Sequence, residues 1–335
     1  MQAAIYGLSG PDLTPGERDF FRDADPAGYI LFARNCVSRP QMRALTDALR
    51  ALAGRDDLPI LIDQEGGRVA RMKPPEWPRF PAAEAFARLY EIAPMSAIEA
   101  ARANAGAIAL QLREVGVNVD CLPVLDVRQP GATDIVGDRA LGGEPMQVAA
   151  LGRAVLDGLE AGGVVGVVKH IPGHGRALVD SHEKLPVVRA PEEALAVDIE
   201  PFRSLAGAPM AMTAHLVYTA WDGERPASQS PVVIEEIVRG RIGFDGFLMS
   251  DDMGMHALSG GFDARARLIL DAGNDAVLHC SGDMGEMVAV ASAVGALEGK
   301  GAERLSRAMA TVAGIDPAGD YATLAEKRDR LLALA

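Results

Sequence analysis

Eight short apolar segments alternate with amphipathic helical stretches along the whole chain. The segments predict buried strands, because they are apolar on both faces and most end in polar or glycine-rich residues. They cover residues 3–8, 28–32, 59–63, 117–126, 164–170, 211–216, 246–251 and 276–280. The helical stretches include residues 40–53, 96–114, 147–161, 191–205, 232–241 and 263–272. This alternation predicts an α/β fold with a parallel sheet, and eight units without a break in composition predict one closed (β/α)₈ barrel of the TIM type.

Length and composition agree with that fold. The chain has 335 residues, of which 49% are hydrophobic and 24% charged, an ordinary balance for a globular protein. One barrel routinely reaches this size. We therefore expect a single catalytic domain over residues 1–335, with terminal helices from about residue 302 to 335 packed outside the barrel.

The charge and the cysteine content limit which partners and which cellular compartment are expected. The formal net charge of −13 argues against binding to nucleic acid or to an anionic membrane. Cys36, Cys121 and Cys280 are odd in number and far apart, which fits a reducing compartment better than a disulfide framework. No segment resembles a signal peptide or a membrane-spanning helix. We expect a cytoplasmic protein that is a monomer or a weak homo-oligomer.

Polar residues follow five consecutive predicted strands, the third to the seventh. They are Asp63-Gln-Glu-Gly-Gly-Arg-Val-Ala-Arg71, Val136-Gly-Asp-Arg139, Lys169-His170, Thr213-Ala-His215 and Ser250-Asp-Asp252. Each group alone has an ordinary structural explanation, such as a helix cap or a surface charge. Together they favour one site, because barrel enzymes keep their active sites at the carboxyl ends of the strands. The donors and acceptor among Asp63, Arg71, Arg139, Lys169 and His170 suit a polyhydroxylated ligand that carries an amide or a carboxylate.

The stretch from Lys169 to His182 contains three of the six histidines in the chain. Glycines at 173 and 175 interrupt regular structure and predict a loop after the fifth strand. Asp180 and His182 are two residues apart, so in an extended loop they point the same way and the carboxylate can orient the imidazole. Such a pair suits general acid/base catalysis.

A metal site is the competing interpretation of the same stretch, with four candidate ligands: His170, His174, Asp180 and His182. Proline and glycine between the histidines prevent two of them from sharing a helical face, so we expect no metal. No nucleotide-binding loop of the GxGxxG or GxxxxGK[ST] type is present, and no cofactor is expected.

Without a metal, Asp251 is the natural nucleophile and His182 the proton carrier of a double-displacement hydrolysis. The nucleophile must be either Asp251 or Asp252, because adjacent strand residues face opposite ways and only one of them should face the barrel mouth. Asp252 precedes a segment where a helix could begin, which predicts a helix cap for it. Asp251 is therefore the candidate nucleophile.

Several of these motifs together resemble the family 3 glycoside hydrolases, and more closely the cytoplasmic bacterial β-N-acetylglucosaminidases of peptidoglycan recycling. The matching segments are Lys169-His-Ile-Pro-Gly-His-Gly with Asp180-Ser-His182, Ser250-Asp-Asp252, Asp63 to Arg71, and Leu31-Phe-Ala-Arg-Asn35. Departures are small: Met253 and Ile171 replace a common Leu and a common Phe, and residues 176–179 are more apolar than a water-exposed lid should be.

The resemblance implies a retaining exo-β-N-acetylglucosaminidase without a cofactor. Its substrate would be a muropeptide fragment, GlcNAc-1,6-anhydro-MurNAc with or without peptide, which links it to cell-wall recycling, cell shape and cell division. Asp251 would be the nucleophile, His182 the acid/base and Asp180 its partner. The N-acetylglucosamine ring would be bound by Asp63, Arg71, Arg139, Lys169 and His170.

Two alternatives stay open. A phosphorylase could use the same scaffold, because a histidine acid/base repels incoming phosphate less than a carboxylate does. A non-catalytic sugar sensor is disfavoured, since it would need neither Asp251 nor the Asp180–His182 pair. For an enzyme, we expect the loop of residues 173–182 to swing between open and closed positions.

Overall fold

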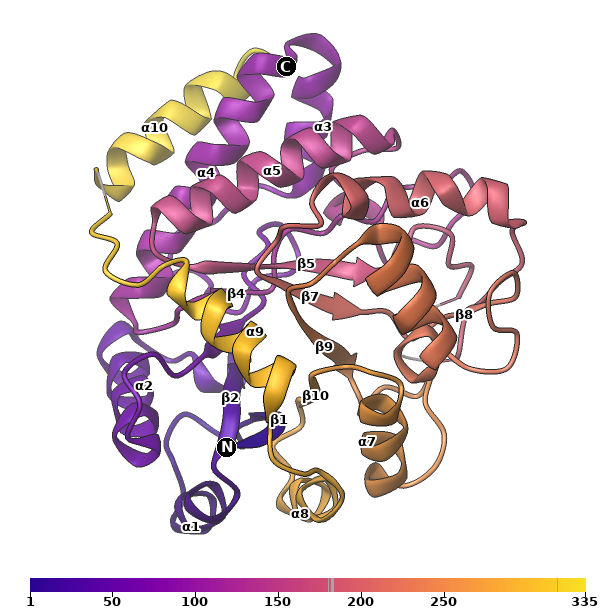
Figure 1. Cartoon of the computed structure of the whole chain (residues 1–335). Coiled ribbons are helices and arrows are strands. Elements are labelled where there is room, and N and C mark those ends of the chain that lie inside the picture. Colours follow the sequence, from indigo (N-terminus) through magenta and orange to yellow (C-terminus); the bar gives the residue numbers. More distant parts are fainter. Residues whose placement is uncertain (180, 182–183, 318) are drawn as a thin grey trace.

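Eight parallel strands close into a barrel in the computed structural model, which describes residues 1–179, 181, 184–317 and 319–335. The strands are β1 (Gln2–Gly7), β2 (Pro26–Leu31), β3 (Ile60–Ile62), β4 (Val119–Asp120), β5 (Val165–Ile171), β7 (Met210–Thr213), β9 (Phe247–Asp252) and β10 (Ala276–His279). Their order around the barrel is β1-β10-β9-β7-β5-β4-β3-β2, and helices surround them (Figure 1). The predicted (β/α)₈ barrel is confirmed, and each expected strand overlaps an observed one, although the fourth, expected over residues 117–126, is only Val119–Asp120.

The helices of the outer layer begin at the signals that their sequences carry. In α2, for example, Ser38 caps the first turn and exchanges hydrogen bonds with Gln41, while Pro40 occupies a position that needs no donor. The outer helices are α1 (Pro15–Ala24), α2 (Arg39–Ala53), α3 (Ala83–Ile92), α4 (Pro94–Glu114), α5 (Pro145–Ala161), α6 (Glu192–Ser204), η4 (Val233–Ile242), α7 (Phe262–Asp271) and α8 (Met284–Ala293). The predicted stretch at 232–241 forms η4, which is a π-helix and not an α-helix.

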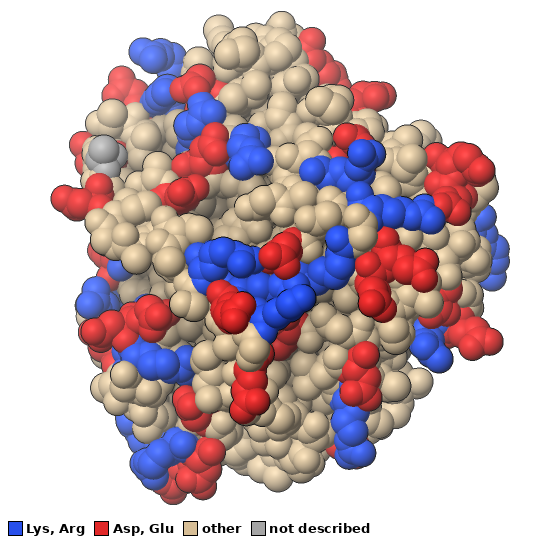
Figure 2. Space-filling view, viewed as in Figure 1, with Lys and Arg blue, Asp and Glu red and all other residues tan. Residues whose placement is uncertain are grey.

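Two helices, α9 (Gly299–Ala310) and α10 (Tyr321–Leu332), follow the last barrel strand and lie outside the barrel (Figure 1). Arg304 of α9 forms ion pairs with Asp245, two residues before β9, and with Asp275, one residue before β10. Helix α9 therefore covers the amino ends of the strands. Figure 2 shows Lys and Arg side chains in a band across the middle of this side of the molecule, with Asp and Glu among them.

Two loops at the other end of the barrel pair with each other. Strands β6 (Val187–Val188) and β8 (Val217–Tyr218) form a small parallel sheet that the sequence did not predict. Among the described residues, no helix is long and apolar enough to cross a membrane.

Candidate active site

A cavity of about 310 Å³ opens at the carboxyl ends of the barrel strands. Among its lining residues are all five predicted sugar-binding residues and the predicted nucleophile: Asp63, Arg71, Arg139, Lys169, His170 and Asp251. They come from β5, β9 and the segments after β3 and β4. The structure thus brings together residues that are spread over nearly two hundred positions of the sequence.

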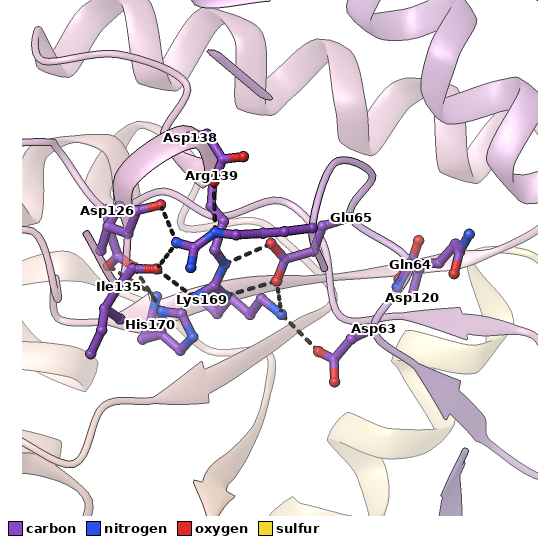
Figure 3. A network of polar contacts seen from close by, with 12 residues as sticks. Asp63, Gln64, Glu65, Asp120, Asp126, Ile135, Asp138, Arg139, Lys169 and His170 are labelled. Atoms are coloured by element: carbon purple, nitrogen blue, oxygen red, sulfur yellow. Dashed lines mark hydrogen bonds and ion pairs between the residues drawn. The ribbon is translucent and has the colours of Figure 1, made fainter. Parts of the chain in front are cut away.

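Lys169 lies at the centre of a buried ion-pair network, between Asp63 and Glu65 (Figure 3). Its Nζ is 2.8 Å from Oδ1 of Asp63 and 2.7 Å from Oε1 of Glu65, and the residue is only 2% exposed. Arg139 contacts both oxygens of Glu65 at 2.8 Å, and Arg71 Nη2 is 2.9 Å from Asp63. Each buried charge therefore has an opposite charge beside it, which offsets the loss of hydration.

The charges of this network fix its protonation state. Burial by itself would raise the pKa of Glu65, but Lys169 and Arg139 outweigh it and lower that pKa to about 2. Burial is likewise outweighed at Asp63, where Lys169 and Arg71 hold the pKa well below its usual value. The pKa of Lys169 is raised. Burial alone would lower it, but the attraction of the two carboxylates outweighs burial. All members of the network are charged at neutral pH.

The carboxylate of Asp126 orients the ring of His170. Its Oδ2 lies 2.7 Å from Nδ1 of His170, and its Oδ1 accepts the backbone N–H of His174 at 2.6 Å. Burial raises the pKa of Asp126, but His170 and the hydrogen bonds reverse the effect and bring it to about 2. Asp126 thereby fixes the ring of His170 against the cavity.

Asp251 and Asp252 differ in what their carboxylates bind. Oδ1 of Asp251 accepts the backbone N–H of Asp252 at 2.8 Å. Burial would raise the pKa of Asp251, but His170 and His215, with that N–H, hold it below its ordinary value, so the carboxylate is ionised. An ionised carboxylate at the cavity wall has the form that nucleophilic attack requires.

Two expectations for Asp252 are wrong. No helix begins after it: residues 253–258 form turns, and α7 starts at Phe262. Its Oδ1 instead accepts the backbone N–H groups of Gly254 at 2.9 Å and Cys280 at 3.2 Å, since a turn offers its amides in the way a helix start does. Both aspartates also line the cavity, although only one was expected to face it.

His215 supports the end of β9 from inside the barrel. Its Nε2 lies 3.1 Å from the carbonyl oxygen of Asp252, and its Nδ1 lies 2.7 Å from the hydroxyl of Ser228. A carbonyl only accepts, so Nε2 carries the proton and Nδ1 accepts from Ser228. Burial lowers the pKa of His215, which keeps the ring neutral.

The first residues of the loop after β5 are held in place by contacts with neighbouring segments. The hydroxyl of Tyr218 donates to the carbonyl of Gly173 at 2.6 Å. Gly175 has no room for a side chain, because a Cβ there would lie 1.9 Å from the carbonyl oxygen of Val127. The predicted acid/base pair, Asp180 and His182, lies outside the residues that the structure describes.

The competing metal site has two of its four candidate ligands among the described residues: His170 in β5 and His174 in the loop that follows it. Nε2 of His174 lies 3.2 Å from the hydroxyl of Ser181, and Nδ1 of His170 is engaged by Asp126. Within the described ranges, no group of three or more His, Cys, Asp and Glu residues could hold a metal ion. The other two candidates, Asp180 and His182, lie outside these ranges, so the expectation that no metal binds stays a prediction.

Glu65 and Asp126 are the site residues that the sequence reasoning did not single out. Glu65 lies two positions after Asp63 in the same strand-end segment, and Asp126 closes the fourth predicted strand. The position of both segments at the carboxyl ends of strands predicted that they contribute to the site, but it did not identify these two carboxylates.

Residues 14–314 match the family model described as the glycosyl hydrolase family 3 N terminal domain. The chain therefore belongs to glycosyl hydrolase family 3. It is 39% identical over 281 residues to a beta-hexosaminidase of Stenotrophomonas maltophilia, an alignment that covers 82% of each chain. The predicted enzyme class, a glycoside hydrolase of the β-N-acetylhexosaminidase kind, is confirmed.

Solved structures give the same picture. NagZ from Neisseria gonorrhoeae superposes with a TM-score of 0.86 at 30% identity, over 100% of this chain and 98% of that one. The same protein in complex with N-trifluoroacetyl-D-glucosamine gives a TM-score of 0.87 at 29% identity, with the same coverage of both chains.

Proposed function

We propose that this protein is a retaining exo-β-N-acetylglucosaminidase. It removes terminal β-linked N-acetylglucosamine from GlcNAc-1,6-anhydro-MurNAc, with or without peptide, during cell-wall recycling in the cytoplasm. The observation that carries the proposal is the position of Asp251, an ionised carboxylate in the same cavity as five polar side chains that suit a sugar ring. The glucosamine derivative bound by the structurally similar neisserial protein supports the choice of sugar.

The reaction takes two displacements at the anomeric carbon. In the first, Asp251 attacks that carbon and the glycosidic oxygen leaves with a proton from His182, which forms a glycosyl ester on Asp251. In the second, His182 takes a proton from water, the resulting oxygen attacks the same carbon, and Asp251 is released. Two inversions give net retention, and Asp180 keeps the His182 ring oriented.

The remaining cavity residues hold the sugar. The carboxylate of Asp63 accepts from ring hydroxyls, and Arg71, Arg139, Lys169 and His170 donate to ring or acetamido oxygens. Because the ion pairs already hold these side chains in place, the sugar binds without first ordering them.

The cellular setting is part of the proposal. The three cysteines are unpaired, which suits a reducing cytoplasm. We further propose that the whole chain acts as one catalytic domain, as a monomer or a weak homo-oligomer.

One incubation tests the proposal. The purified protein is mixed with GlcNAc-1,6-anhydro-MurNAc in a phosphate-free buffer and in phosphate buffer, and the released sugar is identified. Free β-configured N-acetylglucosamine in both buffers is the expected result. Formation of N-acetylglucosamine 1-phosphate in phosphate buffer would show that the reaction is phosphorolysis and not hydrolysis. Release of no sugar in either buffer would overturn the proposed substrate.

A further inference from the structure

A second groove adjoins the candidate active site. It has a volume of about 540 Å³ and is formed by residues 67–80, the segment that follows β3, together with Asp138. Arg68 lines both the groove and the 310 Å³ cavity, so its side chain lies between the two spaces. Among the described residues, none of the sugar-binding or catalytic residues proposed above lines this groove.

The groove is positively charged on a strongly acidic protein. Arg68, Lys73 and Arg79 line it, and Asp138 is the one acidic residue among its lining residues. The Nε of Arg68 is 2.7 Å from Asp138, which neutralises that pair. Among the described residues, Lys73 and Arg79 have no carboxylate within ion-pair distance, and both are exposed. Two uncompensated cations therefore face the groove, while the whole chain carries a net charge of −13.

The groove lies on the side from which the leaving group should depart. Nη2 of Arg68 donates to the carbonyl of Ile135 at 2.6 Å, which joins the groove to the segment after β4. The backbone N–H of Thr133, in that segment, donates to the carbonyl of Ala177 at 3.0 Å. Ala177 is three residues before Asp180, so the same segment contacts the loop that carries the proposed acid/base pair. A leaving group must lie beside its proton donor, and Arg68 of the groove contacts the same segment that contacts this loop.

The size of the main cavity also places the leaving group outside it. A volume of about 310 Å³ is at the lower end for ligand pockets and suits a single sugar ring. Everything beyond the scissile bond must then bind at the rim, where Arg68 separates the cavity from the groove.

We propose that this groove is a leaving-group subsite for carboxylates, with Lys73 and Arg79 as its specificity-determining residues. The inference rests on the proposed function and deepens it: the preferred substrate carries an acidic group, such as a stem peptide, on the sugar that departs. Lys73 and Arg79 attract and position that group without touching the reacting atoms, so they act on substrate recognition and not on bond cleavage.

The test compares matched substrates and matched variants. The substrates are the peptide-bearing GlcNAc-anhydro-MurNAc, the same compound with its carboxylates amidated, and the neutral 4-nitrophenyl N-acetyl-β-glucosaminide. The variant is the double substitution Lys73→Gln and Arg79→Gln. The control, Arg153→Gln with Lys300→Gln, changes the net charge equally by removing two exposed cations of α5 and α9.

We expect the variant to lose about tenfold in kcat/KM on the acidic substrate, corresponding to roughly 1.4 kcal/mol, mostly through KM. The control should lose less than about twofold, and both should match the wild type on the amidated and nitrophenyl substrates. The wild-type preference for the acidic substrate should also weaken with salt, because the groove is exposed.

Three results would overturn the subsite. They are equal losses in variant and control, equal losses on acidic and amidated substrates, and no loss at all. In each of these the wild type still cleaves the disaccharide, so the proposed function stands. Wild-type protein that hydrolyses the nitrophenyl glycoside but neither disaccharide would overturn the proposed substrate and the subsite together.

Discussion

The two sides of the candidate active site are built differently. On one side Lys169, Asp63 and Glu65 are interlocked by ion pairs at the ends of barrel strands, and Lys169 is almost fully buried. On the other, the loop after β5 leaves the barrel at Gly173, and its residues Leu178 and Val179 are 68% and 39% exposed. The fold itself fixes the side that would bind the sugar. The proposed proton-transfer pair, Asp180 and His182, follows this exposed part of the loop in the sequence and lies outside the described residues.

The nucleophile should show the largest effect of any substitution. Asp251→Ala should lower kcat by about 10⁴-fold or more, since the covalent step has no substitute. The far-ultraviolet circular dichroism and the unfolding transition should change little, because Asp251 lies at the cavity wall and not in the apolar core. Steady-state kinetics on the nitrophenyl glycoside measures the loss. A variant that retains a tenth of the activity would place the nucleophile elsewhere.

The loop should show an effect that depends on the leaving group. His182→Ala should slow the disaccharide by about 10²- to 10⁴-fold, because an alkoxide needs a proton to depart. The first step with the nitrophenyl glycoside should be spared, since that group leaves unaided. Asp180→Ala should give the same pattern more weakly. Pre-steady-state measurement of nitrophenol release separates the steps, and equal losses on both substrates would make His182 a binding residue.

Loss of one charge from the buried network should affect both binding and stability. Glu65→Gln leaves Arg139 without its carboxylate partner and should cost about 3 kcal/mol of unfolding free energy, in the range for a broken buried ion pair. Urea denaturation measures it, and kcat/KM should fall with it. Asp47→Asn, which removes the exposed pair with Arg43, is the matched control and should cost less than about 1 kcal/mol. Equal losses of unfolding free energy in Glu65→Gln and Asp47→Asn would mean that the buried ion pairs stabilise the protein no more than an exposed pair does.

A smaller effect should appear below the same network, at Asp120. This residue is fully buried, and although Oδ1 accepts the N–H of Gln64 at 2.9 Å, Oδ2 has no partner among the described residues. Burial raises the pKa of Asp120 to about 8. Between about pH 4 and pH 8 the folded protein therefore holds a proton that the unfolded chain, with a pKa of about 3.9, has lost.

It follows that the wild type loses stability as the pH rises through this range. Asp120→Asn cannot ionise, so its unfolding free energy relative to the wild type should increase from pH 4 to pH 8 by more than about 1 kcal/mol. Denaturant titrations at several pH values measure the difference. A difference that stays constant with pH would mean that Asp120 does not change its proton count on folding.

Chelation should have no effect. A metal ion bound by His170, His174 and His182 would occupy the imidazole that transfers the proton, so we expect full activity after prolonged treatment with a chelator. Activity that disappears and returns on addition of Zn²⁺ would restore the metal interpretation of the loop.

The fold could be predicted because each barrel strand is a short apolar run that ends in polar residues. The helices α1, α3 and α8 were not among those singled out, although α7, which has the same length of ten residues, was. The β6–β8 sheet was missed because two-residue strands arise from the contact of two loops and leave no alternation in the sequence.

The site was predictable as a set of strand ends and less so as a set of contacts. Asp63, Lys169 and Asp251 follow from their position after apolar runs. The roles of Glu65 and Asp126 depend on partners more than forty positions away, Arg139 and His170, and no local pattern encodes such pairs. The turn after Asp252 was mistaken for a helix because both structures place backbone N–H groups near an aspartate.

The central claim is that Asp251 forms a covalent bond to the sugar. A 2-deoxy-2-fluoro glycoside of the gluco series with a good leaving group should inactivate the protein. The fluorine slows both displacements, while the good leaving group restores the rate of the first, so the glycosyl-enzyme forms and its release stays slow. Peptide mapping by mass spectrometry should then find one sugar on the peptide that contains residues 247–252, with fragmentation placing it on Asp251. A label on Asp252, or inactivation without any covalent sugar, would contradict the account.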